Sequence, residues 1–73
     1  MPKLLSARQV IRALQRNGFT ITSRRGSHIK LKKQTNGGEL VVIVPDYLEL
    51  AQGTLASVLR QARLTREELE RLL

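Results

Sequence analysis

The sequence contains no cysteine, no tryptophan and only two other aromatic residues, Phe19 and Tyr47. Without cysteine, neither a disulfide nor a zinc site with thiolate ligands is possible. No apolar run approaches the ~20 residues that a membrane-spanning helix needs, and the N-terminal segment lacks the apolar core of a secretory signal. We therefore expect a soluble, cytoplasmic protein that has no membrane partner.

The chain is short, with 73 residues. This length leaves room for one hydrophobic core, so we expect one domain spanning residues 1–73. A core this small favours a layer of helices packed on a sheet over a fold with a deep cleft.

Acidic residues are missing from positions 1–33, although these positions carry nine of the thirteen lysines and arginines. Residues 34–73 carry four basic and six acidic residues, and the formal net charge of the whole chain is +7. Such asymmetry indicates a polyanionic partner, most commonly nucleic acid, because phosphate binding releases counterions. An anionic membrane is disfavoured, because the basic segment is not one long amphipathic helix with bulky aromatics. A purely solubilising role for the charge also stays open.

The segment "SARQVIRALQRNG" predicts a helix with a signal at each end. Ser6 and Gln9 have the spacing of a capping box, and Gly18 can take a left-handed conformation just past the last turn. Apolar residues recur every three or four positions and predict the buried stripe. This stripe consists of Ala7, Val10, Ile11 and Leu14.

Three strands are predicted after this helix. Alternation in "FTITSR" turns Phe19 and Ile21 toward the core. The segment "QTNGGE" predicts a hairpin turn, since Asn-Gly-Gly readily adopts positive φ. The continuously apolar "LVVIV" predicts a strand in the centre of the sheet that ends at Pro45.

The segment "HIKLKK", between those two strands, decides the functional interpretation. If Ile29 and Leu31 face the core, then His28, Lys30 and Lys32 must share the opposite face. The single histidine of the chain would then stand among basic side chains on one surface.

Two helical segments follow. "GTLASVLRQARL" predicts a helix that opens at Gly53-Thr54 and buries Leu55, Val58, Leu59 and Ala62. "TREELERLL" begins with a second capping-box spacing and could dock as a short last helix through Leu69, Leu72 and Leu73. The order α-β-β-β-α, with a possible extra helix, predicts an α+β fold. Its three-stranded antiparallel sheet is covered by helices on one face and bare on the other.

Several kinds of chemistry are disfavoured by the residues present. One histidine and six scattered acids form no ligand cluster, so we expect neither a metal nor a cofactor. Gly37-Gly38 lies in a hairpin and not before a helix, which disfavours a nucleotide loop. A hydrolase that uses Ser27 is improbable, because the adjacent His28 points to the opposite side of a strand. Scarce aromatics also argue against a base-stacking platform.

Acid–base cleavage of RNA is compatible with these residues. The 2′-hydroxyl of RNA is a built-in nucleophile, so catalysis needs a proton donor or acceptor and cations near the phosphate. Histidine fits the first role because it exchanges protons near neutral pH. The residues are equally compatible with a histidine that is an inert surface residue. The catalytic candidate is His28, and the RNA-binding candidates are Arg24, Arg25, Ser27, Lys30, Lys32, Arg8, Arg12 and Arg16.

Ser27 is open to two interpretations, a phosphate contact through its hydroxyl or a turn residue chosen for its backbone. The arginines at 8, 12 and 16 are spaced by four and form a ridge on the first helix. This ridge is either ordinary solvated surface or an extension of the anion track.

A combination of motifs resembles a known family. "GF…RGSHIKL", then "VVIVP", then "GTLASVLRQARLTREEL", in this order and spacing, is similar to the HicA-type toxins of bacterial toxin–antitoxin pairs. The resemblance implies a fold like that of double-stranded-RNA-binding domains and metal-independent mRNA cleavage by the histidine of "GSH", which is His28. It also implies a HicB-like antitoxin partner that covers this site. Nothing in the residues indicates an oligomeric state.

Two positions depart from the family pattern. Many members carry a further histidine shortly after "VP", where this chain has Asp46-Tyr47, so a role for that histidine does not transfer. A glycine common after "QA" is replaced by Arg63, which we expect to change only how the second helix ends.

Two other functions compete with that of an endoribonuclease. A non-catalytic RNA-binding module could use the same basic face. A DNA-binding protein could use residues 53–73 as two helices and a turn, but three acids and two bases in the last helix make it a poor surface beside phosphates.

Overall fold

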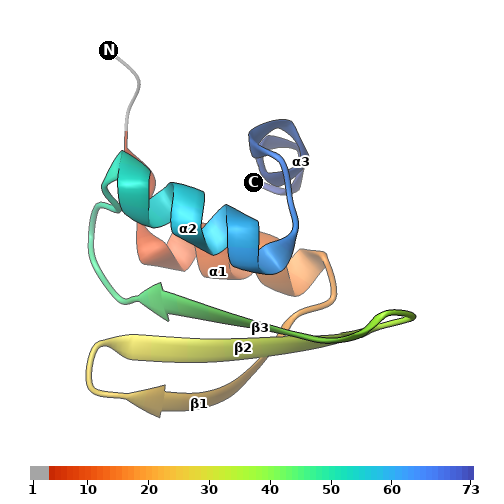
Figure 1. The fold of residues 1–73 in the computed structure, drawn as a ribbon. Coiled ribbons are helices and arrows are strands. Elements are labelled where there is room, and N and C mark those ends of the chain that lie inside the picture. Colours follow the sequence, from red (N-terminus) through yellow and green to blue (C-terminus); the bar gives the residue numbers. More distant parts are fainter. Residues whose placement is uncertain (1–3) are drawn as a thin grey trace.

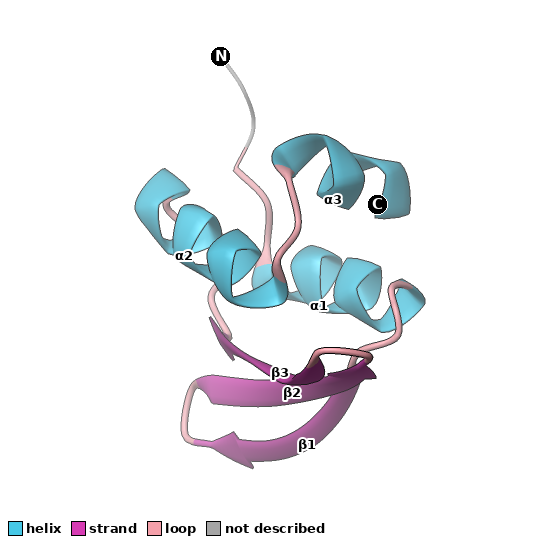
Figure 2. Ribbon diagram, turned by 45° about the vertical axis from the view of Figure 1, so that its right-hand side comes forward, coloured by secondary structure: helices cyan, strands magenta, loops and turns pink. Residues whose placement is uncertain are grey.

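The computed structural model of the chain describes residues 4–73 and has the predicted order of elements. Three antiparallel strands lie in the order β1-β2-β3. The three helices of residues 4–73 all lie on one side of this sheet, and no described element covers the opposite, bare face (Figures 1 and 2). The predicted α+β fold is therefore confirmed. The elements are α1 (Ala7–Arg16), β1 (Thr20–Arg25), β2 (His28–Thr35), β3 (Gly38–Pro45), α2 (Gln52–Ala62) and α3 (Arg66–Leu72).

Helix α1 begins and ends where the sequence predicts. The amide of Gln9 donates to Ser6 Oγ at 3.1 Å, and the amide of Ser6 donates to Gln9 Oε1 at 2.9 Å, which completes the capping box. Gly18, just past the helix, has a φ of 105° that favours glycine. The residues that α1 buries are Ala7, Val10, Ile11, Ala13 and Leu14.

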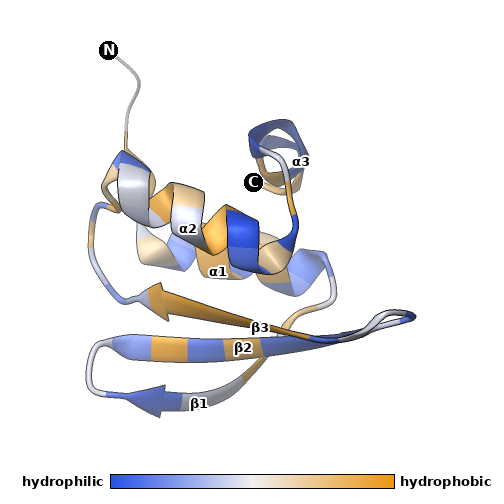
Figure 3. Cartoon of the chain, in the orientation of Figure 1, coloured by the Kyte–Doolittle hydropathy of each residue, from blue (hydrophilic) through white to orange (hydrophobic). Residues whose placement is uncertain are grey.

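The core lies between the helices and one face of the sheet. Hydropathy alternates along β2, whereas β3 is apolar over most of its length (Figure 3). The side chains that β2 and β3 direct toward the helices are almost fully buried. They are Ile29, Leu31, Val42 and Val44.

Helix α3 packs against α1, mainly through the fully buried Leu69. Its capping box joins Thr65 and Glu68. Hydrogen bonds with Thr65, chiefly with its backbone and secondly with its side chain, lower the pKa of Glu68. Leu72 packs partly against the core, as predicted. Leu73 follows the end of the helix and remains 46% exposed, where it borders a shallow pocket with Gln9, Arg12 and Arg16 of α1, so the predicted docking into the core is wrong.

β3 is an edge strand, so the predicted central position is wrong. Two successive hairpins place β2 in the centre. β3 is apolar because a helix packs along it, and not because it is central. Helix α2 packs along β3, and Gln61 Oε1 accepts a hydrogen bond from the amide of Ile43 at 2.9 Å. A side chain of α2 thus pairs a backbone group at the edge of β3 that another strand would otherwise pair.

Ile21 is 44% exposed, although the sequence predicts it in the core. It lies opposite the buried Leu31 and therefore points to the helix-covered side. However, β1 is the other edge strand, and α1 leaves part of Ile21 uncovered there. The predicted direction of the side chain is right and its predicted burial is wrong. Phe19, only 3% exposed, does lie in the core.

Helix α2 begins at Gln52, before the predicted Gly53-Thr54, and its N-cap residue Ala51 makes no side-chain hydrogen bond. Of its predicted apolar stripe, Leu59 is half-buried and the other members are buried. The helix ends at Ala62, and its C-cap residue Arg63 has a left-handed conformation with a φ of 57°. Among the described residues, no helix is both long and apolar enough to cross a membrane.

We expect Arg63→Gly to raise the free energy of unfolding by roughly 1 kcal/mol, the low end of the penalty for an L-residue in the left-handed region. Urea unfolding would measure the gain. Arg63→Ala is the matched control, because it removes the same exposed side chain and keeps the unfavourable φ. Equal stabilities of the Gly and Ala variants would contradict the prediction.

Candidate functional site

β2 presents His28 on the bare face of the sheet. Its neighbours in alternation, Ile29 and Leu31, are 6% and 0% exposed on the helix-covered face. His28 is exposed, and Lys30 and Lys32 are half-buried, on the opposite face. The predicted alternation along β2 is therefore confirmed.

A two-residue turn, Gly26–Ser27, leads into His28. β1 ends at Arg25 and β2 begins at His28, and these two residues pair across the hairpin. Gly26 has a φ of 59°, and Ser27 does not have a positive φ. A positive φ at the first of two turn residues is typical of a type II′ turn, in which that position is glycine. The "GSH" motif thus has a local structural reason, because Gly26 permits the tight turn that starts β2 at the histidine.

A bulge in β1 changes which residues join His28. Ile21 lies opposite Leu31, but Ser23 lies opposite Lys30, so β1 contains one extra residue, at Thr22. One extra residue reverses the alternation of side chains beyond it. Simple alternation from the start of the strand therefore predicts the wrong faces for residues 23–25.

Beyond the bulge, two successive arginines lie on opposite faces. Arg25 lies opposite His28 and shares the bare face with it, as does Ser23. Arg24 lies opposite the buried Ile29 and is directed to the helix-covered side. The structure therefore brings Arg25 together with His28, but not the side chain of Arg24.

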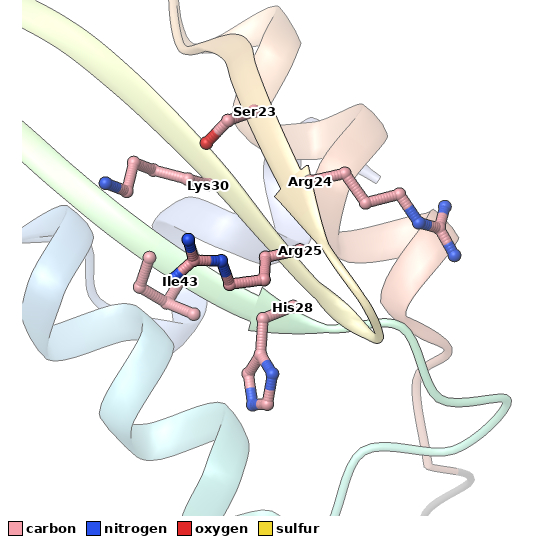
Figure 4. A pocket seen from close by; sticks show the side chains of 6 residues that line it. All are labelled: Ser23, Arg24, Arg25, His28, Lys30 and Ile43. Atoms are coloured by element: carbon pink, nitrogen blue, oxygen red, sulfur yellow. The ribbon is translucent and has the colours of Figure 1, made fainter.

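An open cavity of about 510 Å³ borders His28 on the bare face. In Figure 4 the side chain of Arg24 points away from the other lining residues. Sequence reasoning missed Ser23, which the bulge turns outward. It also missed Ile43, because the continuously apolar segment of residues 40–44 has no alternation to show that Ile43 faces away from the buried Val42 and Val44. The lining residues are Ser23, Arg24, Arg25, His28, Lys30 and Ile43.

Arg24 is held by two partners on its own side of the sheet. Its Nη2 donates to Asp46 Oδ2 at 2.7 Å, and its Nε donates to the carbonyl of Gly26 at 3.2 Å. Asp46 is the residue that follows Pro45, the last residue of β3. Here the carboxylate lies beside a guanidinium and apart from the open face.

The ridge of α1 does not reach the cavity of His28. Arg8 and Arg12 line a separate groove of about 270 Å³ between α1 and β1, together with Ile21 and Arg24. Arg16 donates from Nη1 to the carbonyl of Leu72 at 2.6 Å and so caps the end of α3. The three predicted arginines therefore lie on the helix side of the sheet, and one of them is engaged in packing α3.

The remaining lysines of β2 differ in their surroundings. Lys32 lies on the bare face, where its Nζ is 3.6 Å from Glu39 Oε1. Lys33 lies on the other face, where its Nζ donates to Asn17 Oδ1 at 2.9 Å and stands 5.6 Å from the centre of the Phe19 ring. Lys33 therefore holds β2 to the end of α1, while Lys30 and Lys32 face solvent.

The cations near His28 suit an anionic ligand. Over residues 4–73, no three His, Cys, Asp or Glu side chains gather where they could hold a metal ion. The cavity instead combines one imidazole, a guanidinium and an ammonium group with the hydroxyl of Ser23. These groups can bind a phosphate and exchange a proton with it or with a hydroxyl beside it.

Comparison with known proteins gives one family. Residues 7–64 match the family model described as "HicA toxin of bacterial toxin-antitoxin". This range includes α1, the whole sheet and α2. No curated protein matches the chain.

We expect Gly26→Ala to lower the free energy of unfolding by about 1 kcal/mol, because alanine tolerates a φ of 59° poorly. No atom lies within 4 Å of the position of the added Cβ, so the loss would come from φ and not from a clash. Gly37→Ala in the other hairpin is the matched control, since Gly37 has no positive φ. Equal losses in the two variants, measured by urea unfolding, would contradict the assigned turn.

Proposed function

The chain belongs to the HicA toxin family of bacterial toxin–antitoxin systems, and we propose that it acts in that role as an endoribonuclease that cuts mRNA. Its reaction uses His28 as general acid or base and requires no metal ion or other cofactor. We further propose that the fold is like that of double-stranded-RNA-binding domains, and that the protein works in the cytoplasm.

One observation carries this proposal. His28, Arg25 and Lys30 border the same cavity on the bare face of the sheet. His28 reaches this surface from β2, and Arg25 comes from β1, directly across the hairpin. An imidazole beside two cations on an exposed face is available to a phosphodiester of a large polymer, because no element of the described chain covers it.

The reaction that fits these groups is transesterification within RNA. The 2′-oxygen attacks the adjacent phosphorus, and the bond from phosphorus to the 5′-oxygen breaks. One proton leaves the 2′-hydroxyl and one is added to the 5′-oxygen. His28 accepts the first proton or donates the second, and the other transfer uses water or a lysine. Arg25 and Lys30 stabilise the negative charge that grows on the phosphorane oxygens.

The RNA path follows the cations on both sides of β1. Lys32 extends the bare face along β2, two residues beyond Lys30, or roughly 6.6 Å along the strand. Arg8 and Arg12 supply a second basic surface in the groove between α1 and β1. Both belong to residues 1–33, which are basic and contain no acidic residue. Ser27 acts as a turn residue and not as a phosphate contact, because its backbone carbonyl accepts a hydrogen bond from the amide of Asp46 at 2.6 Å. We assign Arg16 only a peripheral part in binding.

Membership of the family implies that an antitoxin pairs with this toxin. We propose a HicB-like protein that covers the bare sheet face. Such a partner would supply acidic groups for Arg25 and Lys30, and apolar groups for Val41, which is 39% exposed on the same face.

We predict that His28→Ala slows RNA cleavage about 100-fold or more, the low end for losing an acid–base group. RNA affinity should remain near that of the parent, because the cations that hold phosphates are unchanged. Cleavage of a labelled mRNA fragment and binding at one salt concentration would measure both. A variant that cuts as fast as the parent would leave only the non-catalytic RNA-binding module.

Lys30→Ala and Lys32→Ala should each weaken RNA binding and make it less dependent on salt. For single-stranded RNA, the slope of log K against log salt should fall by about 0.7 per lost phosphate contact. Arg71→Ala is the control with the same charge change, since Arg71 is exposed on α3 and pairs with Glu67. Slopes that are the same in all three variants would remove the bare face as the RNA-binding surface.

A further inference from the structure

Three hydrogen bonds meet beside the turn that precedes His28. Arg24 donates to Asp46 through Nη2 at 2.7 Å and to the carbonyl of Gly26 through Nε at 3.2 Å. The backbone amide of Asp46 donates to the carbonyl of Ser27 at 2.6 Å. Both carbonyls of the two-residue turn are therefore held by Arg24 and Asp46.

The two partners come from different segments, so the contact fixes the turn in space. Arg24 is in β1, and Asp46 begins the loop between β3 and α2. The side chain of Asp46 is only 16% exposed, whereas that of Arg24 is 57% exposed. An ion pair with one exposed member contributes little to global stability. Its main consequence here is geometric, because it ties the tip of one hairpin to the end of the neighbouring strand.

Arg24 is poorly placed to bind the same phosphate as His28. The bulge directs it to the helix-covered side, where it lies opposite the buried Ile29. Figure 4 shows its side chain leading away from His28, Arg25 and Lys30. The hydrogen-bonding groups of Arg24 are turned instead toward the turn itself and toward Asp46.

We propose that Arg24 and Asp46 are positioning residues, which hold the Gly26–Ser27 turn and thereby fix the imidazole of His28 relative to Arg25 and Lys30. This inference rests on the proposed function, since it assigns how that site is kept in order. It gives the two neighbouring arginines different roles. Arg25 binds the phosphate, and Arg24 holds the residue that acts on it.

The chain offers a matched test, because Arg24→Gln and Arg25→Gln remove the same charge from adjacent positions on opposite faces. A displacement of about 1 Å at a reacting group can lower the rate about 100-fold. We expect Arg24→Gln to lower kcat about 10- to 100-fold, with KM and the salt slope unchanged. Arg25→Gln should also lower kcat, because Arg25 stabilises the phosphorane, but unlike Arg24→Gln it should raise KM and reduce the salt slope by about 0.7. If Arg24→Gln instead raises KM and reduces the slope as Arg25→Gln does, Arg24 is a phosphate ligand and the inference is wrong.

Conservative variants separate positioning from charge alone. Arg24→Lys keeps the charge but lacks the planar fork that reaches Asp46 and Gly26 together, so it should not restore kcat. Asp46→Asn keeps an acceptor oxygen for Arg24 and should retain more of kcat than Asp46→Ala. Full activity of Arg24→Lys, or equal activities of the two Asp46 variants, would contradict the assigned contacts.

A readout that needs no activity keeps this inference distinct from the proposed function. Amide hydrogen exchange at Asp46, measured by NMR, should be faster in Arg24→Gln than in Arg25→Gln, because only the first loosens the turn. If the parent protein does not cut RNA, the proposed function fails, and the exchange rates alone decide whether Arg24 holds the turn. Equal exchange at Asp46 in the two variants would overturn that role.

Discussion

Neighbouring side chains of β2 point to opposite faces of the sheet, and this alternation links the core to the candidate site. Ile29 and Leu31 fill the layer under the helices, so His28 and Lys30 must stand on the other side. A shift of register by one residue would bury the imidazole and expose the apolar pair. The burial of two aliphatic side chains thus opposes any such slip, and the free energy that folds the domain also keeps His28 on the surface.

The neighbouring strand adds a second constraint. One extra residue in β1 turns Arg25 toward His28 and sends Arg24 to the opposite side. Bulges are common near functional sites because they redirect a side chain without changing the rest of the sheet. In this chain the bulge directs Arg24 and Arg25 to opposite faces of the sheet, so these two adjacent arginines have different roles that the sequence "RR" does not distinguish. One arginine faces the proposed substrate, and the other holds the turn through Asp46.

Local patterns in the sequence predicted most of the fold, including the capping boxes of α1 and α3 and the alternation of β2. These features depend on residues close together in the chain. The errors concern packing between distant segments. β3 was predicted to be central from its apolar run, but Gln61 of α2 pairs its edge. Ile21 points as predicted and stays 44% exposed because α1 covers only part of it at the edge strand β1. The bulge was not predictable, because Thr22 and Ser23 give no apolar signal to reveal the change of phase. For that reason Ser23 was missed and Arg24 was placed with His28.

The central claim, that RNA lies on the bare sheet face beside His28, is tested most directly by an NMR titration. The labelled protein would be mixed with a short RNA whose 2′-oxygens are methylated, so that the nucleophile is blocked. We expect the His28 ring and the amides of Arg25 and Lys30 to shift together, while the amides of α3 remain unchanged. Shifts confined to α2 and α3, with an unchanged His28 ring, would contradict the claim.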